Sequence, residues 1–425
     1  MTADRKYDVV LFGATGFVGR LIARYLVRNA PKEVRIALAG RSQAKLLSVR
    51  NQIGDSRDDV GIEVVDSLNS AQVRALAEDA SVIISSVGPY AKYGMPLVEA
   101  CVAAGTHYAD LTGEVLFMRE TIDHLHGAAQ DSGARIVHTC GFDSIPSDLG
   151  VQMLAAAVRE AGAGGLGRTV LSAKLLGGFS GGTLDSMRNQ LDEVAGSPAK
   201  QRVVEDPYSL SPNRAAEPSP GDGPDSTKAV RDPLLGTWTA PFVMSPINTR
   251  VVRRSNALQD WVYGRRLRYQ EVVEFGSHPA GAVPAHAMAG ALMGLARGLQ
   301  IPPTRKVLDR VLPKPGNGPS EWMQNHGKFR MEITAETDSG VTHKAVFAGH
   351  GDPGYAATSV MFAQSGLCLA LDAEKLSDRF GVLTPATAMG TVLLNRLRAS
   401  GFDARVLPLS GAPAGSPLDS TSSGR

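Results

Sequence analysis

The sequence has little cysteine, little net charge and no recognisable metal motif, and each shortage argues against a class of protein. The three cysteines, Cys101, Cys140 and Cys368, are scattered and lack C-x-x-C spacing, so neither a disulfide framework nor a zinc knuckle is expected. The formal net charge of +2 gives no electrostatic basis for binding nucleic acid. The histidines include no H-E-x-x-H motif, so we expect no metal site.

Long apolar segments are also scarce. MTADRKYDVVLFG runs directly into a strand pattern, so we expect no signal peptide, and the sparse cysteines fit a reducing cytoplasm. Residues 280–301 are about long enough to span a bilayer, but His286 and Arg297 interrupt them and Gly and Ala make them weakly hydrophobic. We therefore predict a buried or surface-lying helix. In a cytoplasmic protein, this helix is the one candidate for peripheral contact with the inner face of the cell membrane.

Residues 6–150 alternate between strand patterns and helix patterns. Apolar runs such as YDVVLFG, RIALAGR and ASVIISSVG are each followed by a segment with apolar residues at helical spacing. Repeated units of this kind are typical of a parallel sheet covered on both faces. We therefore predict an α/β fold in which residues 1–150 form a Rossmann-type, doubly wound domain.

The remaining sequence predicts a second, α+β domain and a group of helices. Within residues 151–350, FRMEITAETDSGVTHKAVFAGH alternates apolar and polar positions across DSG, which predicts an antiparallel hairpin. Residues 197–232 are rich in Pro, Ser, Asp and Arg, which favours a long loop. Residues 351–405 have helix patterns that we expect to pack back on the first domain, and residues 406–425 have the composition of a disordered tail.

Three glycines follow the first strand in the stretch VVLFGATGFVGR. In a dinucleotide-binding turn, the first glycine permits the tight turn, the second lets the backbone approach a pyrophosphate, and the third lets the helix pack close to the sheet. The helix N-terminus offers N–H groups to the phosphates. The alternative is a glycine-rich turn without a ligand, but the position at the head of a βα series favours a dinucleotide. We predict cofactor contacts along the whole turn, at Gly13, Ala14, Thr15, Gly16, Phe17, Val18 and Gly19.

The end of the second strand indicates which nicotinamide cofactor is bound. NAD-binding domains usually place an acidic residue there, whereas ALAGRS places Arg41 and Ser42. A guanidinium matches a 2′-phosphate in charge and geometry, so we predict NADP, with Lys45 close enough to assist. The alternative is a solvated arginine on a loop. Asp66, at the end of the third strand, suits a contact to the adenine amino group or, equally, a helix cap.

The segment SSVGPYAKYG follows the fourth strand, on the edge where open α/β sheets bind ligands. Gly88, which we also expect to contact the cofactor, and the following proline bend the chain and bring Tyr90 and Tyr93 near the predicted nicotinamide. A tyrosine hydroxyl can donate a proton or a hydrogen bond, and Lys92 could assist it. These tyrosines are our candidate catalytic residues; the alternative is that both only pack the loop.

Two further loops end strands on the same edge and offer polar side chains for an active-site wall. HYADLTGE supplies His107, Tyr108, Asp110, Thr112 and Glu114, and CGFDSIPSD supplies Cys140, Asp143, Ser144, Ser147 and Asp148. Asp143 and Ser147 would serve equally as helix caps. Residues 248–269 are basic and contain interleaved aromatics, which suits docking of an acidic carrier protein. The alternative is that these arginines are solvated or pair internally.

Taken together, these segments resemble the saccharopine dehydrogenase-like oxidoreductases, and more specifically the mycobacterial trans-acting enoyl reductases. The resemblance covers nearly the whole chain and is carried by DVVLFGATGFVGRLIARYL, IALAGRS, SSVGPYAKYGMPLVEACVAAGTHYADLTGE, CGFDSIPSDLG, NTRVVRRSNALQDWVYGRRLRY, PKPGNGPS and AQSGLCLALD. The first motif is common to many dinucleotide binders, whereas the later ones are specific.

The resemblance implies an NADPH-dependent enoyl reductase that acts in trans. Its substrate would be the enoyl thioester of a polyketide or fatty chain, held on the carrier protein of a polyketide synthase that lacks a working enoyl reductase domain. Two alternatives stay open. One is a saccharopine-type dehydrogenase that acts on a C–N bond, whose pocket should offer several converging arginines. The other is a lipid-associated, cofactor-binding protein without catalysis.

Overall fold

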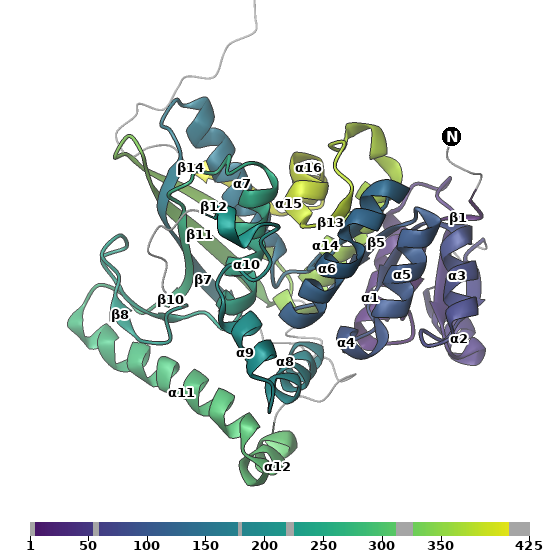
Figure 1. Ribbon diagram of the computed structural model, residues 1–425, viewed down its shortest axis with the longest axis horizontal. Coiled ribbons are helices and arrows are strands. Elements are labelled where there is room, and N and C mark those ends of the chain that lie inside the picture. Colours follow the sequence, from purple (N-terminus) through teal and green to yellow (C-terminus); the bar gives the residue numbers. More distant parts are fainter. Residues whose placement is uncertain (1–4, 54–58, 177–180, 218–224, 312–325, 408–425) are drawn as a thin grey trace, which may run out of the picture.

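The computed structural model describes residues 5–53, 59–176, 181–217, 225–311 and 326–407. They form two seven-stranded sheets that share one hydrophobic core (Figure 1). Residues 408–425, most of the predicted tail, lie outside this range.

The first sheet is parallel, with the strand order β13-β6-β5-β4-β1-β2-β3. Alternate residues of its strands face opposite sides: Val9 and Leu11 belong to one core cluster, Val10 and Phe12 to the other, as the period of two in a strand requires. The strands are β1 (Tyr7–Phe12), β2 (Ile36–Gly40), β3 (Gly61–Val64), β4 (Ala80–Ser85), β5 (His107–Asp110), β6 (Arg135–Val137) and β13 (Gly381–Leu383). The predicted doubly wound sheet is therefore confirmed, and a strand from the C-terminal part of the chain completes it.

Helices cover both faces of this sheet. One core cluster joins the sheet to α1 (Phe17–Asn29), α2 (Gln43–Ile53) and α14 (Thr358–Leu371). The other joins it to α3 (Ser70–Asp79), α5 (Met95–Ala104) and α6 (Val115–Ser132). A Cβ atom on Gly366 would lie 2.8 Å from Cγ2 of Ile84, so α14 packs very close to β4. The C-terminal helices thus pack back on the first domain, as predicted.

The second sheet is mixed, with the order β14-β12-β11-β7-β10-β9-β8. Its strands are β7 (Leu166–Leu176), β8 (Val230–Arg231), β9 (Trp238–Pro241), β10 (Arg268–Glu274), β11 (Lys328–Thr337), β12 (Thr342–His350) and β14 (Asp403–Leu407). β11 and β12 form the predicted hairpin across the DSG turn. α7 (Ile145–Glu160) leaves the first sheet after β6 and packs on β11 and β12, where a Cβ atom on Gly150 would lie 2.6 Å from Ile333.

Several further helices lie beside the second sheet. α10 (Ser245–Leu258) packs on β10, and the short α15 (Pro385–Ala388) and α16 (Gly390–Ala399) pack on α7. α8 (Gly181–Val194) and α9 (Pro198–Glu205) lie between the two sheets in Figure 1. Because α9 falls within residues 197–232, the prediction of a long loop there is wrong at its start.

α11 (Ala282–Gln300) and α12 (Pro302–Val311) form the lower edge of the molecule in Figure 1. Most of α11 is exposed, and Val283 keeps 75% of its surface accessible. Of the two predicted placements for this segment, the surface-lying helix is the one observed. Within the described residues, one helical segment, Pro353–Leu371, has the length and hydropathy of a membrane span. It includes α14, which is buried in the shared core.

Candidate active site

The glycine turn after β1 has a geometry that side chains would disrupt. Gly13 has a φ of +93°, a region that glycine adopts without strain, and a Cβ atom there would lie 2.7 Å from Oγ of Ser86. A Cβ atom on Gly19 would lie 2.1 Å from the carbonyl oxygen of Gly13. The turn and the first turn of α1 are therefore packed as closely as two backbones can be.

The same turn leaves backbone open where a pyrophosphate would lie. Gly16 is exposed and is the N-cap of α1, so no side chain caps that helix. The N–H groups of its first turn point out along the helix axis, where the helix dipole favours an anion. Ala14 is buried, whereas Thr15, Phe17 and Val18 are half-buried. The residues present fit a dinucleotide.

Arg41 and Asp66 lie where the rest of such a cofactor would extend. Arg41 is exposed at the end of β2 and forms no hydrogen bond or ion pair within the described chain. Asp66 lines an open hollow beside Leu68, which is 59% exposed. One Asp66 oxygen accepts the N–H of Leu68 at 3.1 Å, and the N-cap of α3 is Asn69. Asp66 is therefore not the cap of α3, and its second oxygen remains available for an adenine amino group.

The structure separates the two candidate tyrosines. They begin and end a short helix, α4 (Tyr90–Tyr93), that follows β4 and the exposed Gly88. Tyr90 is 4% exposed, its hydroxyl donates to the carbonyl oxygen of Ser85 at 3.0 Å, and it accepts the N–H of Leu111 at 3.2 Å. Burial raises its pKa well above the ordinary value. Tyr90 is thus suited to anchor the loop.

Tyr93 is half-buried, and its hydroxyl has no hydrogen-bond partner within the described residues. It lies at the last position of α4, beyond the carboxyl end of β4. Of the two tyrosines, Tyr93 is therefore the one with a hydroxyl free to act on a substrate.

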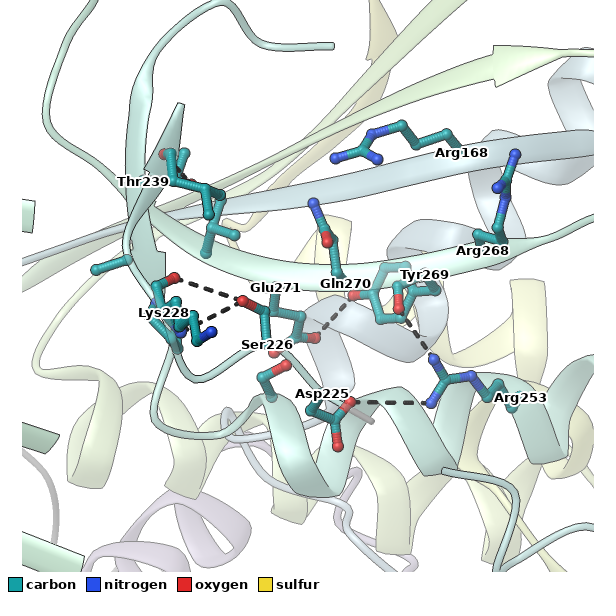
Figure 2. A pocket seen from close by; sticks show the side chains of 15 residues that line it. Arg168, Asp225, Ser226, Lys228, Thr239, Arg253, Arg268, Tyr269, Gln270 and Glu271 are labelled. Carbon is teal, nitrogen blue, oxygen red and sulfur yellow. Dashed lines mark hydrogen bonds and ion pairs between the residues drawn. The ribbon is translucent and has the colours of Figure 1, made fainter. Parts of the chain in front are cut away.

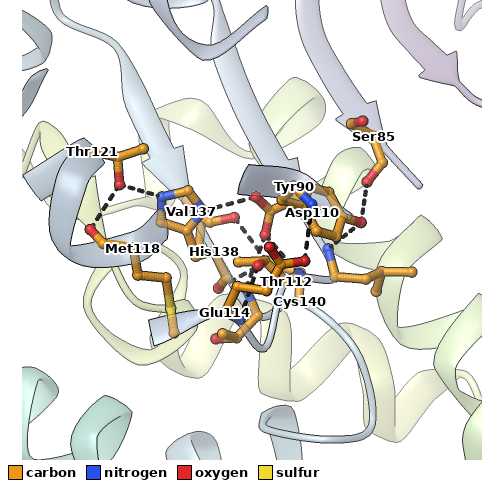
Figure 3. A network of polar contacts seen from close by, with 12 residues as sticks. Ser85, Tyr90, Asp110, Thr112, Glu114, Met118, Thr121, Val137, His138 and Cys140 are labelled. Atoms are coloured by element: carbon orange, nitrogen blue, oxygen red, sulfur yellow. Dashed lines mark hydrogen bonds and ion pairs between the residues drawn. The ribbon is translucent and has the colours of Figure 1, made fainter. Parts of the chain in front are cut away.

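A buried network joins the loops after β5 and β6 (Figure 3). Asp110 accepts the N–H groups of Thr112 and Thr139 on one oxygen, at 3.0 and 3.2 Å, and its other oxygen lies 2.7 Å from Nδ1 of His138. The Thr121 hydroxyl donates to the carbonyl oxygen of Met118 at 2.9 Å, and its oxygen lies 2.8 Å from Nε2 of His138. The carboxylate of Asp110 thereby fixes both loops at the edge where ligands bind.

With this geometry in view, comparisons with known proteins give the family. Residues 9–137 match the saccharopine dehydrogenase NADP-binding domain family. A Mycobacterium tuberculosis protein, itself provisionally assigned as a trans-acting enoyl reductase, is 50% identical over 94% of this chain and 98% of its own length. Trans-acting enoyl reductases of Mycobacterium ulcerans and Mycobacterium bovis are each 44% identical over 94% of this chain and 97% of their own. The chain belongs to the saccharopine dehydrogenase-like oxidoreductases, in the group of the trans-acting enoyl reductases.

A solved structure agrees with the fold of this family. Saccharopine dehydrogenase (L-Glu forming) of Saccharomyces cerevisiae is similar over 94% of this chain and 99% of its own, with a TM-score of 0.53 and 12% identity. The family assignment confirms NADP(H) as the cofactor, and the chain is an NADP-dependent oxidoreductase.

Other members of the predicted wall lie inside the fold. His107 is the first residue of β5, at the opposite end of that strand from the ligand edge, and burial together with Arg135 lowers its pKa to about 4. Tyr108 and Cys140 are fully buried. Ser144 donates to Asn248 at 2.7 Å, and Ser147 accepts from the same amide at 3.2 Å. Ser144 and Ser147 thus connect the start of α7 to α10, whereas Tyr108 and Cys140 lie inside the first domain.

Asp148 predicts a measurable pH dependence of stability. It is fully buried in the first turn of α7, where burial raises its pKa to about 7 despite hydrogen bonds from Ser255 and from the N–H of Ala386. Because the pKa is raised on folding, the contribution of Asp148 to the free energy of unfolding is full below about pH 4. It is lost as the pH rises through 7. Asp148→Asn should therefore flatten the fall in the free energy of unfolding between about pH 4 and 7, a difference on the order of a few kcal/mol, which a profile of Tm against pH would detect.

The matched control for Asp148→Asn is Glu160→Gln, which neutralises an exposed carboxylate on the same helix. We expect the Tm profile of that control to follow the unsubstituted protein. Parallel profiles for Asp148→Asn and the unsubstituted protein would show that Asp148 does not titrate in this range.

Three of the six arginines of the basic segment are buried inside the fold. Arg250, Arg253 and Arg254 are 2–6% exposed. Each donates to a backbone carbonyl oxygen in the segment before α10, namely those of Val204, Pro207 and Leu210. Arg250 also pairs with Asp225 at 2.6 Å. The alternative of internal pairing is thus the correct one for these three, while Arg265, Arg266 and Arg268 stay exposed.

A hollow of about 240 Å³ lies between β10 and residues 225–230 (Figure 2). Its arginines do not converge: Arg168 and Arg268 lie on one side of β10 and Arg253 on the other. Arg168 pairs with Asp232 at 2.6 Å, and Arg253 donates to the carbonyl oxygen of Tyr269 at 3.2 Å. The hollow lacks the clustered, free guanidinium groups that a substrate with several carboxylates would need.

Two residues at the site were missed by the sequence analysis. Ser186 and Gln190, both on α8, bind the loop after β5, through the Glu114 carboxylate at 2.8 Å and the N–H of Val115 at 2.8 Å. They lie more than 70 residues further along the chain, in a segment without a recognisable motif, and no local pattern could have indicated them.

Proposed function

We propose that this protein is an NADPH-dependent enoyl reductase that acts in trans on a polyketide or fatty chain carried by a polyketide synthase. The observation that carries the proposal is the hydroxyl of the half-buried Tyr93, which has no partner within the described residues and lies on the same sheet edge as the glycine turn. The names of the relatives support the trans-acting role, since the partner synthase would present the enoyl thioester on its carrier protein.

The reaction needs three things from the site. A hydride must reach the β-carbon, the charge that develops on the thioester oxygen must be stabilised, and the α-carbon must receive a proton. When bound, NADPH supplies the hydride. The Tyr93 hydroxyl donates a hydrogen bond to the thioester oxygen or a proton to the α-carbon. The products are the saturated thioester and NADP⁺, which balances one hydride and one proton added across the double bond.

The hollow in Figure 2 gives no support to the C–N substrate. A saccharopine-type substrate carries several carboxylates, and its binding would need several free cations at one site. The arginines of the hollow in Figure 2 are either bound to internal partners or lie on opposite sides of a strand. A thioester makes no such demand.

The test is NADPH oxidation by the purified protein with long-chain enoyl thioesters, presented on a carrier protein and on a pantetheine mimic. We expect oxidation that is faster with the carrier-bound thioester. NADPH binding without oxidation of either thioester, followed by turnover of a C–N substrate, would replace the proposal by the saccharopine-type activity. Binding without turnover of any of these substrates would favour a non-catalytic protein.

A further inference from the structure

We propose that Glu114 is a positioning residue that couples the loop carrying Tyr93 to helix α8 of the second domain. The role in turnover rests on the proposed function, whereas the coupling itself does not. Glu114 ends the loop after β5 and is the N-cap of α6, yet its side chain does not cap that helix. The carboxylate instead reaches across to Tyr90 of α4 (Figure 3) and to Ser186 of α8.

The carboxylate accepts three hydrogen bonds. One oxygen accepts the N–H of Tyr90 at 2.9 Å and the hydroxyl of Ser186 at 2.8 Å, and the other accepts the N–H of Ala91 at 2.9 Å. Glu114 is 2% exposed and forms no ion pair within the described chain. Burial raises its pKa, and these three hydrogen bonds oppose that rise. A buried carboxylate that satisfies donors from two domains is costly to displace from either of them.

α8 makes further contacts with the same region. The side chain of Gln190 accepts the N–H of Val115, the residue that follows Glu114, at 2.8 Å. Two residues after Gln190, Asp192 pairs with Arg305 of α12. Its pKa is lowered by Arg305 and, to a lesser extent, by the charge of Lys92 on α4. α8 is therefore bound between the loop of the first domain and the outer helices of the second.

This arrangement determines how Tyr93 is presented. α4 is four residues long, too short to hold its own geometry. Its start is fixed by the Glu114 carboxylate and by the Tyr90 side chain, and Tyr93 follows three residues later. If α8 shifts, the hydrogen bond from Ser186 shifts Glu114, and α4 shifts with it. The Tyr93 hydroxyl, on the cofactor domain, is thus held at a fixed distance from the second domain. Reaction rates depend steeply on such distances.

The experiment compares Glu114→Gln and Ser186→Ala by amide hydrogen exchange in the full chain with saturating NADPH. Coupling predicts that each variant raises exchange about tenfold at Tyr90 and Ala91, which bind Glu114, and also at Val115, which binds α8 through Gln190. If Glu114 only caps the start of α4, Glu114→Gln should raise exchange at Tyr90 and Ala91 alone, and Ser186→Ala should raise it at neither. That second pattern would overturn the proposal, whether or not the protein reduces enoyl thioesters.

Kinetics add a second readout where the wild-type protein turns over. Both variants should lower kcat by about tenfold and leave the KM for the thioester and the Kd for NADPH within about twofold. Ser186→Thr keeps the hydroxyl and should restore kcat. Glu120→Gln, at an exposed position of α6, the helix that follows Glu114, is the matched control and should behave as wild type. An unchanged kcat in Ser186→Ala, with raised exchange, would limit the role of the contact to stability.

Discussion

Replacing Tyr93 by phenylalanine is expected to lower kcat for enoyl thioester reduction by about 100-fold, the scale of losing one proton or hydrogen-bond donor in the transition state. The substitution removes an oxygen that has no partner within the described residues, so the Tm should not change. The Kd for NADPH should also stay within about twofold, because the cofactor contacts predicted here lie on other residues. Steady-state kinetics, fluorescence titration and thermal unfolding together measure the three quantities.

Tyr90→Phe provides the comparison, because the same atom is removed from a different environment. The Tyr90 hydroxyl is buried between the carbonyl oxygen of Ser85 and the N–H of Leu111. Its loss leaves both groups unpaired and should cost about 1–3 kcal/mol of the free energy of unfolding. The two variants should therefore show opposite signatures: a loss of rate in one and a loss of stability in the other. Wild-type kcat in Tyr93→Phe would assign the donor role to another group.

The contrast between these tyrosines shows where sequence reasoning reaches its limit. They stand three residues apart in SSVGPYAKYG, and both were equally good donors by residue type and by distance from the strand end. Which of them turns inward depends on Phe117, whose ring stacks on Tyr90 at 6.0 Å, and on Glu114. Both of these belong to another βα unit, so no local pattern contains the answer.

The fold was predictable where its signals are local. The glycine turn, the alternation of strands and helices and the DSG hairpin each depend on neighbouring residues. β13 could not be predicted in the same way: it has three residues and pairs with β6 across more than 240 positions. The burial of the arginines of α10 could not be predicted, for a related reason. Charged residues normally lie in solvent, but here the carbonyl groups of residues 204–210, which reach α10 only through the tertiary fold, offer acceptors that allow burial.

Replacing Arg41 by alanine is expected to raise the Kd for NADPH by about 10- to 100-fold, because a charge-assisted pair with a phosphate is worth about 1.5–3 kcal/mol. The Kd for NADH, which lacks the 2′-phosphate, should change by about twofold at most. This prediction depends on the state of Arg41 in the structure: it is exposed at the end of β2 and has no internal partner within the described chain. Its removal therefore breaks no contact of the fold, and the Tm should be unchanged.

Arg28→Ala is the matched control for this experiment, since Arg28 is exposed in the last turn of α1. It lies about 16 Å along the helix from the glycine turn, at 1.5 Å per residue. That variant carries the same loss of charge and should bind NADPH as wild type at 0.15 M salt, where a charge at this distance is largely screened. Equal losses for NADPH and NADH in Arg41→Ala would mean that Arg41 supports the turn and does not read the 2′-phosphate. Adding Lys45→Ala to Arg41→Ala should then separate the two cases. If Lys45 also contacts the 2′-phosphate, its loss would raise the Kd for NADPH further and leave the Kd for NADH unchanged.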